Sequence, residues 1–447
     1  MDRFLHRWRN PRTVNSQAAA TPHRPRRTKF VSQQIHSHEF DNGLILVAQS
    51  MDWLESSAFT LALPAGCAKD PSDRRGLGNF TCEMVQRGSG SLDSREFSEA
   101  LDRLGTDRSA SVSAEHTSYG AATLADKLDE TLALYADLVR RPRLPASQME
   151  EARQVCLHEV QAVEDDLAQM AMQHVRLQTF GEPCGRSNPG DREGVSAVTS
   201  EDVAEFIDQH YVPNGAILSV AGKIDWPRLR DQVEQQFGSW QGASDSHSQS
   251  QVVHRAEYSH VEHDSAQVHI AVSYPSIPYD HADFFVARGA LGVLSDGMSS
   301  RLFTHVREEK GLCYTIYATY SAVLHHGRVL SYAATSTERA QETLDVMLSE
   351  LVRLSDGIDD GELNRLKARV KSALIMQQES STARSGAMAG DWYHLGRVRT
   401  KDEITKAIDG LTVDTVNAYL AENRASDFSI VTVGAEPLRV AEPLAKK

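Results

Sequence analysis

The stretch VTSEDVAEFIDQHYVPNGAILSVAG at residues 198–222 has a counterpart, LTVDTVNAYLAENRASDFSIVTVG, at residues 411–434. In each stretch a threonine stands where it can cap a helix, an amphipathic segment follows, and an apolar strand ends in glycine. Four residue pairs share a separation of 213 positions: Thr199 with Thr412, Val203 with Val416, Phe206 with Tyr419, and Ile217 with Ile430. The match predicts that the same helix–strand unit closes two halves of the chain.

A second pair of segments repeats at nearly the same separation: DETLALYADLVR at 129–140 and QETLDVMLSELVR at 341–353. Two matches at one offset indicate a duplicated chain. Between the halves, GSWQGASDSHSQSQ at 238–251 lacks apolar periodicity and is typical of a linker. We therefore expect an α+β protein with two homologous domains, 30–237 and 252–440, each a sheet covered by helices, with the ligand chamber enclosed between them.

Composition and charge restrict the class of protein. The 447 residues are 40% hydrophobic and 24% charged, and no run of about 18 apolar residues predicts a membrane-spanning helix. Residues 1–29 carry eight Arg or Lys and one acid, Asp2, so we expect a basic disordered tail without the apolar core of a secretory signal. The whole chain has a net charge of −14. The remainder is therefore strongly acidic, which argues against nucleic-acid binding.

Five scattered cysteines without a CxxC pair are typical of a reducing compartment. Together with the lack of a signal, they favour a cytoplasmic location, with the mitochondrial matrix as the alternative.

The stretch GLGNFTCEMVQRGS at 76–89 predicts a helix on which Asn79, Cys82 and Glu83 share one face, because they stand at i, i+3 and i+4. A metallopeptidase helix uses this spacing for two metal ligands and a base, but the residue types here differ. A later helical segment, EARQVCLHEVQAVEDD at 151–166, carries Glu159.

The second half contains GMSSRLFTHVREEKGLCYTIYATYS at 297–321. Its pattern predicts an amphipathic helix that points Leu302, Phe303 and Val306 inward, ends at Gly311 and leads into a strand. Arg307 and Tyr314 stand on either side of the helix end, so both can point into one space.

This segment resembles the second-domain motif of the pitrilysin-type (M16) zinc peptidases, especially the bacterial and mitochondrial processing-peptidase branch. YVPNGAILSVAGKID at 211–225 and FGEPCGRSNPG at 180–190 are similar to that family too, and the similarity covers about residues 36–437. AEHTSYGAATL at 114–124 resembles the family's edge strand, where an extended peptide would dock.

Active members of the family carry H-x-x-E-H, in which both histidines bind Zn²⁺ and the glutamate activates water, and a later glutamate is the third ligand. In this chain Asn79 stands at the first histidine, Cys82 at the base and Glu83 at the second histidine, while Glu159 matches the third ligand. An amide is a weak zinc donor and a thiol a poor base for this step. The resemblance therefore implies no intact catalytic residue and no metal in this chain. Glu83 and Glu159, if close, would share a proton or recruit a basic partner.

In the resembled family, residues at the positions of Arg307 and Tyr314 hold the substrate carbonyl through charged and hydroxyl donors. The structural alternative is an arginine that favours the helix dipole and a tyrosine ring in the core. The resemblance thus implies a non-catalytic, substrate-binding subunit of a heteromeric zinc metalloendopeptidase for unfolded peptides or precursors, with zinc in a homologous H-x-x-E-H partner. Two alternatives stay open: a scaffold or binding protein without a proteolytic role, and a peptidase with an atypical metal site. Whether the chain is itself an enzyme is also left open.

Overall fold

The computed structural model describes residues 33–242, 256–323, 325–377 and 379–440. The expected tail and most of the expected linker lie outside these residues, so the proposed domain bounds stay predictions. Below, the first half is residues 33–242 and the second half is residues 256–440 without positions 324 and 378.

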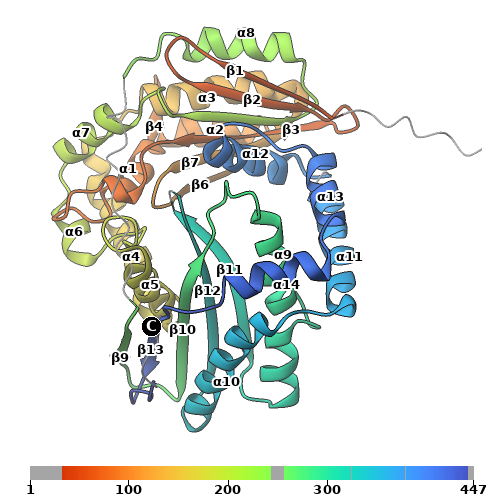
Figure 1. The fold of residues 1–447 in the computed structure, drawn as a ribbon. Coiled ribbons are helices and arrows are strands. Elements are labelled where there is room, and N and C mark those ends of the chain that lie inside the picture. The colour runs from red at the N-terminus through yellow and green to blue at the C-terminus, as the bar shows by residue number, and fades with distance from the viewer. Residues whose placement is uncertain (1–32, 243–255, 324, 378, 441–447) are drawn as a thin grey trace, which may run out of the picture. The chain divides into compact units, whose positions relative to one another are not determined.

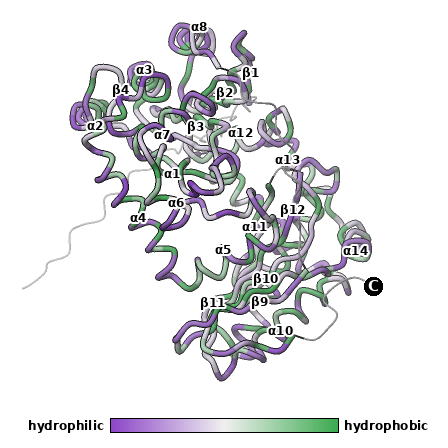
Figure 2. Tube along the Cα trace, turned by 90° about the vertical axis from the view of Figure 1, so that its left-hand side faces the viewer, coloured by the Kyte–Doolittle hydropathy of each residue, from purple (hydrophilic) through white to green (hydrophobic). Residues whose placement is uncertain are grey.

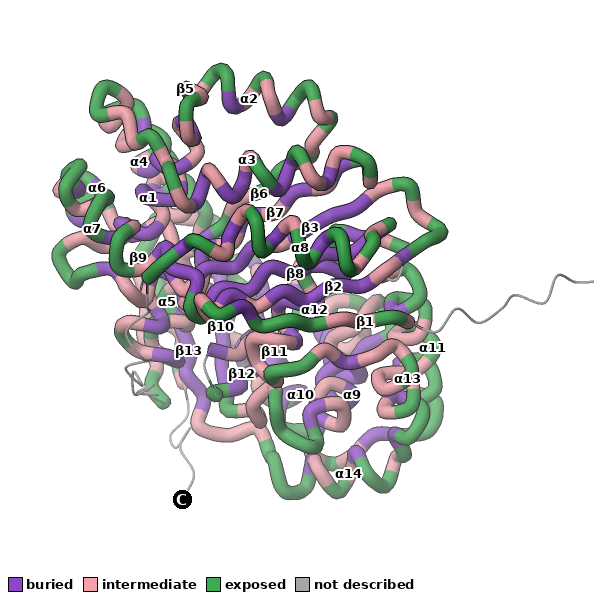
Figure 3. Tube along the Cα trace, turned by 90° about the horizontal axis from the view of Figure 1, so that it is seen from above, coloured by how far each residue is buried: buried purple, intermediate pink, exposed green. Residues whose placement is uncertain are grey.

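The first half contains a six-stranded sheet in the order β1-β2-β8-β3-β7-β6 (Figure 1). Its strands are β1 Gln34–Glu39, β2 Ile45–Ser50, β3 Ser56–Leu63, β6 Asp107–Val112, β7 Thr117–Leu124 and β8 Ile217–Gly222. Neighbouring strands are antiparallel except β2 and β8, which are parallel. Figure 3 shows the central strands β3 and β8 mostly buried and the edge strand β1 mostly exposed, which matches their apolar and polar sequences.

Helices accompany this sheet, and a short hairpin, β4 Gly88–Ser89 and β5 Leu92–Asp93, follows the first of them. The helices are α1 Leu77–Val85, α2 Ser94–Arg103, α3 Leu128–Arg140, α4 Met149–Asp165, α5 Leu167–Phe180, α6 Arg192–Ala197, α7 Ser200–His210 and α8 Trp226–Phe237. Helix α8 is amphipathic: it buries Leu229, Val233 and Phe237, and most of its other residues are hydrophilic (Figure 2).

The second half contains a five-stranded sheet in the order β11-β12-β10-β13-β9, in which only β9 and β13 are parallel. Its strands are β9 Tyr258–Glu262, β10 Gln267–Ser276, β11 Thr315–Val323, β12 His326–Ser336 and β13 Ser429–Gly434. Its α-helices are α9 Phe284–Ser295, α10 Ala340–Arg353, α11 Asp360–Gln377, α12 Ser381–Leu395, α13 Lys401–Asp409 and α14 Val413–Glu422.

The duplication predicted from the sequence is confirmed. The run β2-β8-β3-β7-β6 has the same pattern of one parallel and three antiparallel pairings as β9-β13-β10-β12-β11. Thr199 and Thr412 each cap their helix through a reciprocal capping box, before α7 and α14. The repeated segments at 129–140 and 341–353 form α3 and α10. The chain is therefore α+β with two homologous halves.

The edge-strand prediction for residues 114–124 was wrong. Residues Thr117–Leu124 form β7, which pairs with β3 on one side and β6 on the other. The edge of the first sheet on this side is β6, Asp107–Val112. The prediction rested on a resemblance in sequence, and the sequence of a strand does not specify how many strands pair with it.

The two halves exchange helices. Helix α5, from the first half, packs through Ala171 and Val175 on Ala271, Leu330 and Val431 of the second sheet. Helix α12, from the second half, packs through Met388 and Ala389 on a cluster of first-half residues: Val47, Met51, Ile217 and Ala221. Figure 1 shows α12 against the first sheet and α5 beside β10. Helix α12 thus covers one face of the first sheet, and helix α5 covers one face of the second sheet. Each of these helices comes from the other half of the chain.

A buried polar contact reinforces the second exchange. Arg384 of α12 is 1% exposed, and its Nε donates to Gln49 Oε1 of β2 at 2.6 Å. Burial lowers the pKa of Arg384 to about 10, which still leaves it charged at neutral pH. A charge buried this deeply is costly to separate from its acceptor, so the contact fixes α12 to the first sheet.

All five cysteines are free and buried. In the part of the chain that the structure describes, no helix has both the length and the apolar character needed to cross a bilayer.

Candidate functional site

The start of α1 is held by contacts that fix the helix in place. Gly76 precedes it with φ of 95°, and a Cβ there would lie 2.5 Å from the carbonyl oxygen of Pro189, so only glycine fits. The buried carboxylate of Asp70 accepts hydrogen bonds from the backbone N–H groups of Gly76 at 2.7 Å and Gly78 at 2.8 Å. The motif at 76–89 and the loop at 180–190 therefore meet at the beginning of the helix.

The structure brings Asn79 and Glu159 together. Asn79 Nδ2 donates to Glu159 Oε2 at 2.5 Å across the contact between α1 and α4. The same amide nitrogen lies 3.9 Å from Cys156 Sγ. The positions that match the first and third zinc ligands are thus neighbours, joined directly by a hydrogen bond.

Glu83 has a different partner. Its Oε1 accepts from Arg87 Nη2 at 2.8 Å, one helical turn along α1. Arg87 also lies 3.5 Å from Glu151, and only 14% of its side chain is exposed. The sequence left open whether Glu83 and Glu159 share a proton or recruit a base, and the structure answers it: Glu83 pairs with Arg87, and Glu159 with an amide.

Cys82 points into the first-half core and is 5% exposed. The hydroxyl of Tyr119 hydrogen-bonds to it, and Tyr119 in turn lies 2.9 Å from the Tyr211 hydroxyl. Burial raises the pKa of the Cys82 thiol to about 12, so it is a neutral thiol at pH 7. A buried neutral thiol is a poor general base for activating water.

These four side chains do not fit zinc. The amide of Asn79 is a weak donor already bonded to Glu159, Cys82 lies in the core at 5% exposure, and Glu83 is paired with a cation. Among the residues that the structure describes, no three His, Cys, Asp or Glu side chains are grouped so that they could hold a metal ion. We therefore derive no catalytic step through zinc at α1.

Arg307 and Tyr314 form a second candidate site. Residues Leu302–Glu309 form a π-helix, labelled η4, and Gly311 with φ of 60° turns the chain toward β11. The guanidinium carbon of Arg307 lies 5.0 Å from the centroid of the Tyr314 ring. π-Helical turns are rare and occur frequently at functional sites. The structure thus brings the two predicted residues together.

The surroundings of this pair favour contact with a ligand. Tyr314 is 81% exposed, which excludes the alternative of a ring in the core. Within the described part of the chain, Arg307 donates no hydrogen bond, and the carboxylate paired with it, Glu308, is 3.8 Å away. The guanidinium therefore keeps its hydrogen-bonding capacity for another molecule.

The expected position of Phe303 was wrong. Leu302 and Val306 are buried in the second-half core as predicted, but Phe303 is only half-buried, with its ring centroid 4.6 Å from the Arg307 guanidinium carbon. The spacing of four between Phe303 and Arg307 was visible in the sequence, but hydrophobicity alone placed the ring in the core. Arg87 was also missed as the partner of Glu83, although it stands four residues later, a spacing at which helical side chains can pair.

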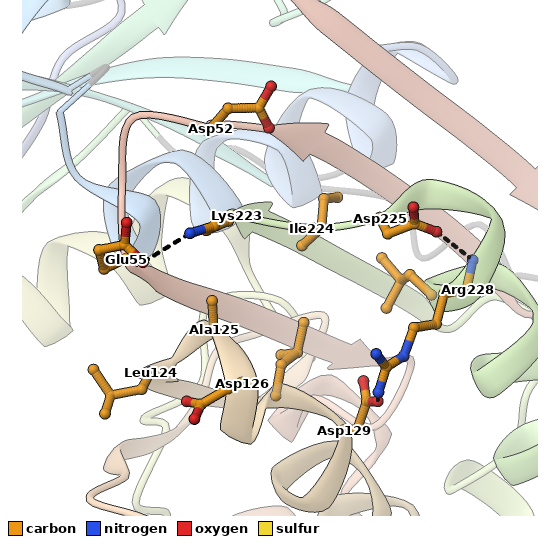
Figure 4. A pocket seen from close by; sticks show the side chains of 12 residues that line it. Asp52, Glu55, Leu124, Ala125, Asp126, Asp129, Lys223, Ile224, Asp225 and Arg228 are labelled. Carbon is orange, nitrogen blue, oxygen red and sulfur yellow. Dashed lines mark hydrogen bonds and ion pairs between the residues drawn. The ribbon is translucent and has the colours of Figure 1, made fainter.

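A hollow of about 770 Å³ lies elsewhere in the first half, between the turn after β2, the start of α3 and the β8–α8 connection (Figure 4). Its two cations are already neutralised: Lys223 pairs with Glu55 at 2.8 Å and Arg228 with Asp129. Asp225 caps α8 by accepting from the Arg228 backbone at 2.9 Å. None of the candidate residues lines this hollow, so it belongs to neither site.

Two family models match the chain in succession. "Insulinase (Peptidase family M16)" matches residues 46–190, and "Peptidase M16 inactive domain" matches residues 197–370. The chain belongs to peptidase family M16. The degenerate α1 positions fall within the first M16 match, and Arg307 and Tyr314 fall within the second.

M16 relatives are similar over nearly the whole chain. The uncharacterized zinc protease YmxG of Bacillus subtilis is 24% identical over 401 residues, which is 89% of this chain and 98% of that protein. A peptidase M16 inactive domain from Pseudomonas fluorescens has a TM-score of 0.84 at 18% identity and covers 91% of this chain and 99% of its own. A protease from Helicobacter pylori has a TM-score of 0.83 at 19% identity, with 91% and 100% covered. The two solved structures support the M16 fold.

Proposed function

We propose that this chain is a zinc-free, substrate-binding subunit of a heteromeric M16-type metalloendopeptidase that acts on unfolded peptides or precursors. The Zn²⁺ would be held by a homologous partner with an intact H-x-x-E-H motif. The observation that supports the proposal is a contrast between the two candidate sites. The carboxylates of Glu83 and Glu159 already have partners in this chain, Arg87 and Asn79. Among the described residues, Arg307 donates no hydrogen bond and lies beside the exposed Tyr314.

In this arrangement Arg307 and Tyr314 bind peptide and do no bond-breaking chemistry of their own. The guanidinium is permanently charged and can donate to a peptide carbonyl, and the Tyr314 hydroxyl supplies a second donor. Donors aimed at a carbonyl hold the peptide in register and stabilise the charge that develops when water attacks in the partner's site.

The test is co-expression with an M16 homologue from the same genome that carries H-x-x-E-H, followed by cleavage of a fluorescein-labelled, reduced and carboxymethylated protein as the unfolded substrate. We expect co-purification and cleavage at least roughly tenfold faster than by the partner alone. Arg307→Ala should abolish most of the stimulation. Arg95→Ala, which alters an arginine whose side chain is 88% exposed, is the matched control and should leave stimulation intact.

Three results would contradict the proposal in different ways. Equal cleavage with and without this chain would remove the subunit role. One zinc per chain in the isolated protein, with chelator-sensitive cleavage, would indicate a peptidase with an atypical metal site. Isolation within a membrane complex together with a lack of peptide binding would indicate a scaffold.

A further inference from the structure

Phe303 has no role in the function described so far, yet it makes the shortest ring contact with the Arg307 guanidinium. The guanidinium carbon lies 4.6 Å from the Phe303 centroid and 5.0 Å from the Tyr314 centroid. A cation within about 6 Å of an aromatic face is attracted by the ring quadrupole. Arg307 is therefore in contact with two aromatic rings.

A nearby arginine shows the alternative way to hold a guanidinium. Arg301 precedes the same π-helix, and its Nε and Nη2 donate to Glu362 at 2.7 and 2.8 Å, while Nη2 also donates to the Gly357 carbonyl at 2.7 Å. Those contacts fix Arg301 but use up its donors. Stacking on rings restrains Arg307 without using any N–H group, because a ring face accepts the charge and leaves the donor edge free.

We propose that Phe303 is a positioning residue, which together with the Tyr314 ring holds Arg307 in place and leaves its N–H edge open for the peptide carbonyl. This inference rests on the proposed peptide-binding role of Arg307. Phe303 would affect peptide affinity only by holding the Arg307 side chain in place. The π-helix η4 would therefore contribute Phe303 and Arg307 together to peptide binding.

The binding test uses the full chain and fluorescence anisotropy of the labelled, carboxymethylated protein. Phe303→Leu keeps the bulk and removes the ring face, and we expect it to weaken binding about 3- to 10-fold. Phe303→Tyr should restore affinity to within about twofold, since it retains the face. In an Arg307→Ala background, Phe303→Leu should have no further effect. Met298→Ala, at a side chain that is 78% exposed, is the control and should change nothing.

A ligand-free measurement keeps the inference testable whatever the probe does. In an NMR spectrum of the free chain with labelled arginine, ring currents should displace the Arg307 Nε–H resonance, and Phe303→Leu should return it toward the ordinary arginine position. An unmoved resonance overturns the inference. So does an equal loss of affinity from Phe303→Leu with and without Arg307. If Arg307→Ala weakens binding and Phe303→Leu does not, the proposed function stands and this inference fails. If the wild-type chain neither binds the probe nor stimulates the partner, the proposed function fails.

Discussion

Helix α1 and the π-helix η4 lie in different halves of a duplicated chain, and the charged side chains at these two places have different kinds of partner. At α1, Glu83 is paired with Arg87 and Glu159 with Asn79, so both carboxylates already have partners within the chain. At η4, Arg307 rests on Phe303 and Tyr314 and has no described hydrogen-bond partner. Hydrogen bonds and ion pairs between side chains of the same protein stabilise its fold. An N–H donor that is held in place but lacks a partner in the protein is available to a ligand. Under the proposed function, the α1 side chains serve the fold and Arg307 with Tyr314 serve peptide binding.

The largest expected effect is on affinity for unfolded protein, and it should distinguish Arg307 from Arg87. Arg307→Ala should weaken binding of the labelled unfolded protein about 10- to 100-fold, because a hydrogen bond from a charged donor is worth about 1.5–3 kcal/mol. Arg87→Ala should leave the affinity unchanged within about twofold, since Arg87 serves only Glu83 and its neighbours. Anisotropy titrations measure both. A comparable loss of affinity in the two variants would show that the sites do not differ as described.

The sites should also differ in their response to pH. Burial raises the pKa of Asp70, which caps α1, from its usual 3.8 to about 7, although two backbone N–H groups donate to it. A raised folded-state pKa means that the stabilising contribution is full below about pH 4 and is lost as the pH rises through about 7. Between pH 5 and 8 the wild type should lose about 2–3 kcal/mol of unfolding free energy relative to Asp70→Asn.

Thermal and urea unfolding at several pH values measure this difference. Asparagine keeps one of the two acceptor oxygens and does not ionise, so the unfolding free energy of Asp70→Asn should depend less on pH than that of the wild type. Parallel profiles for the two proteins would mean that Asp70 does not titrate in this range. Arg307→Ala is the control, and its unfolding profile should follow that of the wild type.

The effects on stability should be smaller and opposite in order: Arg87→Ala should be less stable than Arg307→Ala. Arg87→Ala leaves Glu83 without its cation in a partly buried position, and we expect a loss of about 1–2 kcal/mol of unfolding free energy. Glu83→Gln in the same chain should recover part of the loss, because it removes the uncompensated charge. Arg307→Ala should stay within about 0.5 kcal/mol of wild type. Urea denaturation measures the three variants, and an unstable Arg307→Ala would contradict the assignment.

The smallest expected effect concerns the Tyr314 hydroxyl. Tyr314→Phe keeps the ring beside Arg307 and removes one exposed donor, so affinity for the unfolded protein should fall only about 2- to 5-fold. Tyr314→Leu removes ring and hydroxyl together and should cost more. The two titrations distinguish the ring from the donor, and equal losses would assign the whole contribution to the hydroxyl.

The duplicated fold was predictable because its signals are local. A capping threonine, an amphipathic helix and an apolar strand recur at 198–222 and 411–434, and the structure has α7–β8 and α14–β13 there. The exchange of α5 and α12 was not predictable, since periodicity identifies which face of a helix is apolar and leaves open which sheet covers it.

At the candidate sites, too, part of the arrangement was predictable from the sequence and part was not. Sequence spacing placed Asn79 and Glu83 on one face, and Arg307 close to Tyr314, but it could not choose among possible partners. Glu83 could have faced Glu159 and instead bonds to Arg87, and Phe303 could have joined the core and instead contacts Arg307. Such choices depend on how neighbouring elements pack, which a single sequence does not specify.

The exchange of α5 and α12 has a consequence for how the chain can be divided. A half produced without the other would present a bare apolar sheet face to water and would carry a helix with nothing to pack on, so it would aggregate. A protease that cut between residues 242 and 256 would give two fragments that remain associated, held by Ala171, Val175, Met388 and Ala389 and by the Arg384–Gln49 bond. We therefore expect the two halves, although copies of one unit, to behave as complementing fragments of a single folding domain.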